Sequence, residues 1–419
     1  MRRRRRVEVV LAGLVAVGWS ATVGFGRAQA TPAAQATRVA GADRIATAVA
    51  ASQDLWGAGA ASAVVLARFD TFPDALAGTP LAVAKAGPLL LTPPTSLDSS
   101  AAGEIQRVLP KGGTVYLLGG TAALSDGVFS SVQAMGYQAV RYGGADRYQT
   151  AAIIDEAVGN PGVIFEATGL SFPYALISGV AAAHAGGVVV LTSGSSMPAA
   201  TSSYLAQHQG ASRVAVGSEA AAADPSANPV VGSDQYQTST MLAGDLFQNP
   251  ATVGLASGTN FPDALSGGAH IGHLGGPLLL TDPNTLPPSV QQYLSGSSSS
   301  IGEAVTYGGT AAVSEEVENA VQAAVTGPAS GGPACSASMS DPTPGQGGSE
   351  TLNVTSNVAN TTGSAVVHYK TTNSTYPVTT DANGSGFTTF SIGHPTLGYQ
   401  VRVDVTIGSA ACSTSFTPQ

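Results

Sequence analysis

Two arginines have the side chains best suited to binding a charged ligand. Arg44 and Arg147 each end a Gly-Ala-Asp-Arg sequence. A planar guanidinium presents a fork of N–H donors that matches phosphate or carboxylate oxygens. The structural alternative is that each Arg bonds to its neighbouring Asp or to a backbone carbonyl and so fixes a turn at the start of a helix. The sequence leaves both interpretations open.

Paired glycines are a second candidate feature for anion binding. Gly119-Gly120 and Gly308-Gly309 each lie between an apolar run and a segment expected to be helical. Backbone N–H groups at such a turn, at the positive end of the next helix, hold an anion without a basic side chain. The same glycines also suit a tight connection from strand to helix, so either role explains them.

The sequence lacks the motifs of a familiar enzyme. The segment G-L-S-F-P at 169–173 lacks the last Gly of the G-x-S-x-G nucleophile motif. His270 and His273 form H-x-x-H without a third ligand nearby, so we expect neither a metal nor a cofactor. The acidic residues that recur in the repeats do so singly rather than as the close pair that a glycosidase uses. We therefore expect a protein that is not an enzyme.

The first thirty residues predict export. Five arginines at 2–6, an apolar run at 9–17 and Ala28-Gln29-Ala30 form the parts of a signal peptide over residues 1–30. An uncleaved membrane anchor is the alternative, but this run is shorter than the about 20 residues that a bilayer requires. Removing residues 1–30 takes away six Arg and one Glu and changes the net charge from −9 to −14. We expect no nucleic-acid partner and, after cleavage, no membrane contact.

A motif that occurs three times indicates the elements that position these residues. Each copy contains Asp-Arg or Asp-Gln, then F-P-[DY]-A-L, then a Gly-containing apolar run that ends in Leu-Thr. The interval from the Pro to that Thr is 19 residues in every copy: Pro73 to Thr92, Pro173 to Thr192 and Pro262 to Thr281. Such regular spacing indicates three diverged copies of one structural unit.

Each copy is expected to fold as an α/β unit. Short apolar runs without period-two alternation, such as 63–67 and 114–118, are typical of parallel strands covered by helices on both faces. Phe72-Pro73 is expected to open a helix, because Pro is tolerated in the first turn. The second copy is shortened, and 220–229 is too short and Pro-broken to replace a missing helix. We predict three Rossmann-like units around a pseudo-threefold axis, at 36–139, 140–228 and 229–326.

The C-terminal region is expected to be a separate β domain. Residues 327–348 are rich in Gly, Pro and Ser and predict a connector that contains Cys335 and the first strand region of the β domain. Residues 349–419 alternate β-branched or aromatic residues with polar ones, which predicts a small all-β immunoglobulin-like sandwich. Cys335 and Cys412 are an even pair in an exported chain, so we expect a disulfide between the first and last strands.

Together, these repeated motifs resemble the type 2 cell-wall-binding repeat, a family of exported proteins of Gram-positive bacteria that usually carries three tandem copies. The resemblance covers residues 37–326. It implies a pseudo-trimer that attaches noncovalently to an anionic polymer of the wall, and it links the Pro-Leu-Leu-Leu-Thr strand with anchoring. The positions concerned are Pro88, Leu89, Leu90, Leu91, Thr92, Thr192, Pro277, Leu278, Leu279, Leu280 and Thr281. The second copy departs with G-V-V-V-L at 187–191, and the third has Gln235 in place of the Arg.

We therefore predict a secreted, non-catalytic protein of the cell wall or cell surface. Its repeats would anchor it, and its tail would be displayed or would bind other surface proteins. Because the mature chain is acidic, attraction to an anionic polymer requires a local site or a bridging cation. Two alternatives are an extracellular protein that binds a soluble carbohydrate or nucleotide-like ligand, and a wall hydrolase or hydrolase modifier.

Overall fold

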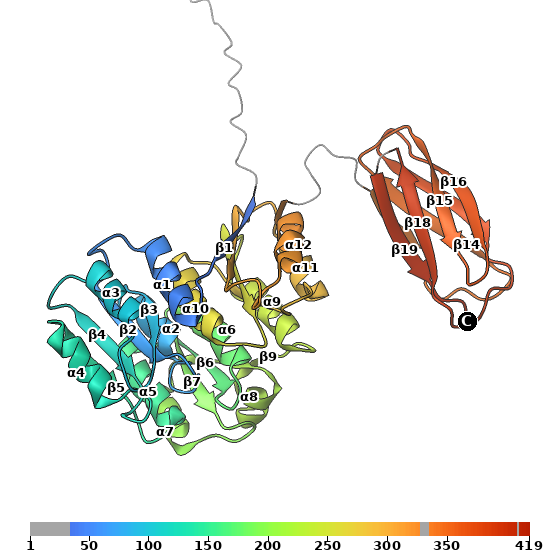
Figure 1. Cartoon of the computed structure of the whole chain (residues 1–419). Helices are drawn as coiled ribbons and strands as arrows, with labels where there is room; N and C mark the ends of the chain where they lie inside the picture. Colours follow the sequence, from blue (N-terminus) through green and yellow to red (C-terminus); the bar gives the residue numbers. More distant parts are fainter. Residues whose placement is uncertain (1–33, 327–334, 409) are drawn as a thin grey trace, which may run out of the picture. The chain divides into compact units, whose positions relative to one another are not determined.

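The computed structural model describes residues 34–326, 335–408 and 410–419 (Figure 1). The predicted signal peptide and residues 327–334 of the predicted connector lie outside these residues. Within the described ranges, no helix is long and apolar enough to span a bilayer. The repeats (34–326) and the tail (335–419) are described separately below.

The first α/β unit has a parallel sheet with the strand order β3-β2-β4-β5. Its strands are β2 (Ala63–Arg68), β3 (Leu89–Thr92), β4 (Thr114–Leu118) and β5 (Gln138–Tyr142). Its helices are α1 (Arg44–Leu55), α2 (Gly78–Ala84), α3 (Ser99–Val108) and α4 (Asp126–Ala134). β2 and β3 are almost entirely buried, which explains why their sequences are apolar without alternation.

The second unit repeats this order as β7-β6-β8-β9. Its strands are β6 (Val163–Thr168), β7 (Val188–Thr192), β8 (Ser212–Val216) and β9 (Asn228–Val230). Its helices are α5 (Arg147–Val158), α6 (Pro173–Ala185), α7 (Ala199–Gln207) and α8 (Ser218–Ala223). The expectation that the last helix is missing was wrong, because α8 begins directly after Gly217. It has only six residues, since Pro225 disfavours helical backbone at Asp224.

The third unit has the order β11-β10-β12-β1. Its strands are β10 (Thr252–Ser257), β11 (Leu278–Thr281), β12 (Glu303–Tyr307) and β1 (Gln35–Val39). Its helices are α9 (Gln235–Leu246), α10 (Pro262–His273), α11 (Pro288–Gly296) and α12 (Glu315–Thr326). The predicted three α/β units with parallel sheets are thus confirmed.

The strand that opens each sequence repeat belongs to the sheet of another unit. β5 and β9 complete the sheets of the units before them, and β1 pairs in parallel with β12, from Gln35 opposite Glu303 to Val39 opposite Tyr307. The N-terminal strand therefore closes a ring of three units. The repeats predicted at 36–139, 140–228 and 229–326 therefore do not coincide with the three sheets. In each case the strand at the start of a repeat is hydrogen-bonded in the sheet of another unit.

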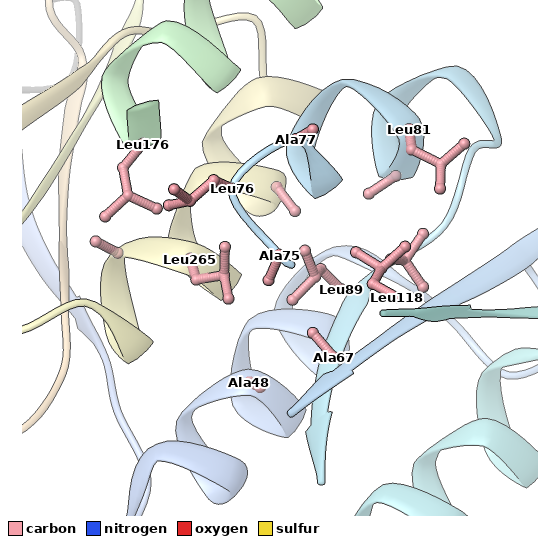
Figure 2. Packing of buried hydrophobic residues seen from close by; sticks show 14 of the residues in the cluster. Ala48, Ala67, Ala75, Leu76, Ala77, Leu81, Leu89, Leu118, Leu176 and Leu265 are labelled. Atoms are coloured by element: carbon pink, nitrogen blue, oxygen red, sulfur yellow. The ribbon is translucent and has the colours of Figure 1, made fainter. Parts of the chain in front are cut away.

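The three helices that follow the F-P motif pack against one another around the pseudo-threefold axis. α2, α6 and α10 each contact the other two (Figure 1). Leu76, Leu176 and Leu265, the Leu of the motif in each copy, belong to one hydrophobic cluster (Figure 2). A Cβ on Gly179 would lie 3.1 Å from the Cβ of Thr79, so the second unit needs a small residue at this crossing.

The expected helix start at Phe72-Pro73 is wrong for the first unit. α6 and α10 begin at Pro173 and Pro262, but α2 begins at Gly78 after a series of turns. Pro80 explains this difference. A helix that began at Pro73 would place Pro80 in its interior, where it has no N–H to donate, whereas a start at Gly78 places it in the first turn.

The tail is a seven-stranded antiparallel sandwich of the predicted immunoglobulin-like kind. One sheet has the order β13-β14-β17 and the other β16-β15-β18-β19. The strands are β13 (Cys335–Met339), β14 (Ser349–Ser356), β15 (Thr362–His368), β16 (Asn373–Thr379), β17 (Ser385–Ser391), β18 (Val401–Ile407) and β19 (Ala410–Phe416). A disulfide joins Cys335 to Cys412, as predicted. β13 lies within 327–348, the stretch that was predicted to contain Cys335 and the first strand region of the β domain.

Candidate functional site

Three loops at the carboxyl ends of the parallel strands converge on the pseudo-threefold axis. They carry Phe72, Phe172 and Phe261, whose ring centroids lie 5.6, 5.6 and 6.0 Å apart. Phe72 and Phe172 are half-buried, and Phe261 is 8% exposed. Ligands of open α/β sheets bind at the carboxyl ends of the strands. From the sequence these residues were recognised only as part of the repeat, although an aromatic residue that recurs in three copies signals a shared role.

Arg44 and Arg147 hold these loops in place through hydrogen bonds to backbone carbonyls. Their Nη1 atoms donate to the carbonyl oxygens of Phe69 at 3.1 Å and Gly169 at 2.5 Å. In the third unit the Nε2 atom of Gln235 donates to the equivalent carbonyl at 3.0 Å. A bond to a backbone carbonyl is therefore present in each unit, but it holds the loop after a strand and not the turn at the start of the helix, as the structural alternative had proposed. Both arginines are half-buried and lie beside the loops that carry the phenylalanines, so they also bring positive charge to this place.

The Asp of each repeated motif caps a helix. Asp43, Asp146 and Asp234 precede α1, α5 and α9, and each accepts at least one hydrogen bond from a backbone N–H group in the first turn. The Thr four residues later, at 47, 150 and 238, accepts from the N–H of the motif's Gly in every copy. The conserved spacing therefore builds one turn three times, and that turn sets the direction of the following Arg or Gln.

The first glycine of each Gly-Gly turn is tightly packed and has a backbone conformation that favours glycine. Gly119 and Gly308 have φ of +97° and +98°, and a Cβ there would lie 2.9 Å from Asp74 Oδ2 and 2.6 Å from Asp263 Oδ2. Their N–H groups donate to the carbonyls of the neighbouring strand. The second residues, Gly120 and Gly309, are more open, with no atom within 3.4 Å of a built Cβ.

Two further arginines, which sequence analysis missed, support these turns. Arg141 Nη1 donates to the carbonyls of Gly120 at 3.1 Å and Leu124 at 2.6 Å. Arg38 Nη1 donates to Gly308 O at 2.7 Å, and its Nη2 lies 2.5 Å from a carboxylate oxygen of Glu318. Both arginines come from strands that complete the sheet of another unit. The second unit has Pro229 at this position and a shorter turn. The sequence pattern that could have revealed them is an Arg three residues before the Gly of the Gly-Ala-Asp-Arg motif, which occurs in two copies.

The Pro-Leu-Leu-Leu-Thr strands are core rather than surface. All the positions predicted from the family resemblance in β3, β7 and β11 are buried, and the leucines are at most 3% exposed. The closing threonines bond to the loops that leave the strands: Thr92 to Ser96 O, Thr192 to Gly194 O and Thr281 to Asp282 O. Their side chains therefore do not reach the surface. β3 and β11 instead contact helices of other units, α10 and α6.

A buried carboxyl group lies where the third unit meets the first. Burial raises the pKa of Asp263, and Thr47 and Arg44 of the first unit partly offset this effect. On the rim of the same face, Arg68 pairs with Asp70 at 2.7 Å, and this bond lowers the pKa of Asp70. Arg68 is thus paired with a carboxylate, whereas Arg44 bonds to the carbonyl oxygen of Phe69 and lies near Asp263 without an ion pair among the described residues.

The two histidines of α10 bond to residues of the first unit. His270 Nδ1 lies 2.7 Å from Tyr307 Oη and its Nε2 lies 3.0 Å from Asp54 Oδ2 of the first unit. His273 Nε2 lies 3.1 Å from Gly87 O. Burial lowers the pKa of both histidines. Among the described residues, no group of three His, Cys, Asp or Glu side chains is arranged to hold a metal ion.

Comparisons with known proteins agree with this architecture. The family model for cell wall binding domain 2 matches residues 38–129, 141–225 and 230–318. The chain is 27% identical over 287 residues to N-acetylmuramoyl-L-alanine amidase LytC and 26% identical over 285 residues to an amidase enhancer, both from Bacillus subtilis. These matches cover 67% and 66% of this chain but only 57% and 38% of the relatives.

Two solved structures share the fold of the repeats. Cwp6 and Cwp8 from Clostridium difficile superpose with TM-scores of 0.62 and 0.63 at 22% and 21% identity. The similarity covers 70% of this chain in both cases, and 48% and 52% of those proteins. The chain thus spans about half the length of these structures.

Proposed function

The chain belongs to the cell wall binding domain 2 family, and on that premise we propose that its three repeats anchor it to an anionic polymer of the bacterial cell wall. The observation that carries the proposal is the convergence of the three loops around Phe72, Phe172 and Phe261. A long polymer offers repeated groups, and three equivalent loops on one axis offer repeated contacts for them.

The polymer-binding site that we propose is smaller than the set expected from the sequence. Arg44 and Arg147 supply local positive charge on an acidic chain, and the open Gly120 and Gly309 leave room for an anionic group beside the backbone. Gly119 and Gly308 maintain the turns. The buried Pro-Leu-Leu-Leu-Thr strands contribute by holding the three units together, without touching the polymer.

We propose further that the protein is secreted, acts at the wall without catalysis, and displays its tail there. The family match supports this view because it accounts for all three repeats, and the remaining described domain is a disulfide-linked β sandwich. The alternatives are a protein that binds a soluble carbohydrate or nucleotide-like ligand, and a hydrolase or hydrolase modifier. The amidase and the amidase enhancer to which the repeats are similar make the second alternative worth testing.

Sedimentation with isolated wall sacculi tests the proposal. The mature chain is mixed with sacculi before and after extraction of the anionic polymer, and the pelleted fraction and the released muropeptides are measured. We expect pelleting that is lost on extraction, with no muropeptide release above a protein-free control. Equal pelleting after extraction would point to another ligand, and release of muropeptides, alone or with an added amidase, would favour the hydrolase or modifier.

A further inference from the structure

The tail contains a cleft at one end of the sandwich, lined by residues of β16, β17 and the loops beside them. It measures about 320 Å³ and lies between the turn from β15 to β16 and the loop after β17. Small-molecule sites begin at roughly this size, ~300 Å³. Side chains with recognition chemistry in its lining include Tyr369, Lys370, Ser374, Tyr376, His394 and Thr396. We propose that this cleft binds a saccharide unit that carries an anionic group, either a carboxylate or a phosphate.

Two tyrosines provide flat surfaces for a sugar ring. Tyr369 and Tyr376 are both half-buried. Tyr376 stacks on the buried Phe390 with a centroid distance of 4.8 Å and an angle of 18°, so its orientation is fixed by the core of the tail. Aromatic faces carry a negative quadrupole and present a rigid apolar surface with a polar tip. The C–H groups of a pyranose ring suit such a surface, and its hydroxyls suit the polar rim.

The hydroxyl group of Tyr369 is buried and makes no hydrogen bond with any of the described residues. This hydroxyl is closed to solvent, so a ligand in the cleft meets the exposed part of the Tyr369 side chain and not its hydroxyl.

The charge of the cleft selects for an anion. From residue 335 onward the chain has two basic residues of the Lys and Arg type, Lys370 and Arg402. Arg402 pairs with Asp404 at 2.6 Å. Lys370 is exposed and forms no ion pair with the described residues, and it shares the cleft with His394. None of the acidic residues of the tail lines the cleft, so its unpaired positive charge meets a ligand directly.

The cleft is preformed by bonds in its own walls. The loop after β17 is tied to a neighbouring segment by Ile392 N–H to Gly348 O at 3.0 Å and by Gln346 Nε2 to Pro395 O at 2.7 Å. On the other wall, Tyr369 N–H donates to Thr372 O at 2.9 Å across the turn. A site that is already ordered loses less conformational entropy on binding than a flexible one.

With this cleft the protein would have two separate binding sites for the cell wall, one in the repeats and one in the tail. It lies in a domain with its own hydrophobic cluster, separate from those of the repeats. Binding of a saccharide there does not depend on anchoring through the repeats. If both occur, the second contact becomes intramolecular and strengthens retention at the wall.

Saturation-transfer NMR on the full mature chain tests the proposal with four probes. N-acetylmuramic acid carries a carboxylate, N-acetylglucosamine 6-phosphate carries a phosphate, N-acetylglucosamine is the neutral control, and inorganic phosphate serves as a competitor. We expect at least one acidic sugar to bind about fivefold tighter than the neutral sugar, and the tighter one identifies the anionic group. Equal binding of all three sugars, or complete displacement by inorganic phosphate at equal concentration, would overturn the proposal.

Three variants locate the binding. Lys370→Gln should abolish the preference for acidic sugars, and Tyr369→Ala should weaken binding of all three sugars at least threefold, because it removes an aromatic surface that lines the cleft. The melting temperature of Tyr369→Ala is measured alongside, because the ring also packs on Phe416. Phe387→Ala is the control, since Phe387 is 70% exposed on β17 and does not line the cleft. Binding that is unchanged in both cleft variants would contradict the proposal. Failure here is separable from failure of anchoring, because sedimentation of these variants with sacculi reports on the repeats.

Discussion

At the scale of single residues, one position performs the same task with different chemistry. Arg44, Arg147 and Gln235 all donate to a loop carbonyl at the carboxyl end of a strand. The third unit therefore shows that an amide suffices to hold the loop. The guanidinium supplies something that the loop does not need, namely a positive charge on an acidic protein. A variant at these positions can therefore keep the hydrogen bond to the loop and remove only the charge.

The double variant Arg44→Gln, Arg147→Gln uses that difference. We expect its melting temperature to stay within a few degrees of wild type, because Gln reproduces the bond seen at Gln235. Sedimentation with sacculi should fall at least fivefold if the charges bind the polymer. The matched control is Arg44→Ala, Arg147→Ala, which should lose stability as well. If the Gln variant sediments like wild type, the arginines are only structural.

A second residue-scale prediction concerns a carboxyl group in the core of the second unit. Glu166 lies in β6 at the position that Leu66 and Leu255 occupy in the other units, and it is fully buried. Burial, reinforced by Asp224, raises its pKa to about 8. A carboxyl whose folded pKa is raised stabilises the fold below its unfolded pKa, and this contribution is lost as the pH rises toward 8.

Glu166→Leu should therefore be more stable than wild type, by about 3 kcal/mol at pH 7. The advantage should grow from pH 5 to pH 8, which denaturant unfolding at several pH values measures. Glu166→Gln removes the titration without adding apolar surface and serves as the control. Unfolding curves of wild type and Glu166→Leu that shift in parallel over this range would contradict the interpretation.

At the scale of elements, the turns after β4 and β12 decide how closely strand and helix approach. Gly308 has positive φ and sits against Asp263, whereas Gly309 has open space where a Cβ would be. Gly308→Ala should cost about 1–3 kcal/mol of unfolding free energy, and Gly309→Ala less than about 0.5 kcal/mol. Thermal unfolding of the two variants checks this contrast. Equal losses would mean that the turn is not fixed by the backbone at Gly308.

The closing strand is the second feature at this scale. β1 pairs with β12, and Arg38 binds Gly308, Val313 and Glu318 around the same turn. A chain that starts at residue 40 leaves β12 as an unpaired edge. We expect its amides to lose hydrogen-exchange protection, while β4 keeps its own protection through β5. Unchanged protection in β12 would show that the ring does not depend on its first strand.

At the scale of the whole molecule, the sequence predicted the units better than their connections. The apolar runs at 63–67 and 114–118 are local signals of buried strands, and these signals were correct. The pairing of β1 with β12 joins residues more than 260 positions apart, and no local pattern encodes such a partner. For the same reason the roles of Arg38 and Arg141 were missed, because each acts in a sheet other than that of its own repeat.

The candidate site shows the same division. The site residues predicted from the sequence were chosen because they recur, but recurrence does not distinguish a surface residue from a core residue. Leu90 and Leu279 recur because every unit needs the same buried strand, whereas the recurring Phe of the F-P motif reaches the axis. Only the packing of the units separates these two reasons for repetition.

The central claim is that the ring of three repeats is by itself the part that holds the wall polymer. The most direct test is sedimentation of a mature chain that ends at Thr326, with intact sacculi and with sacculi stripped of anionic polymer. The hydrophobic clusters of the repeats are separate from that of the tail, so this chain is expected to fold. It should sediment with intact sacculi as the full mature chain does and remain in solution with stripped ones. Loss of sedimentation in a folded truncated chain, or equal sedimentation with stripped sacculi, would contradict the claim.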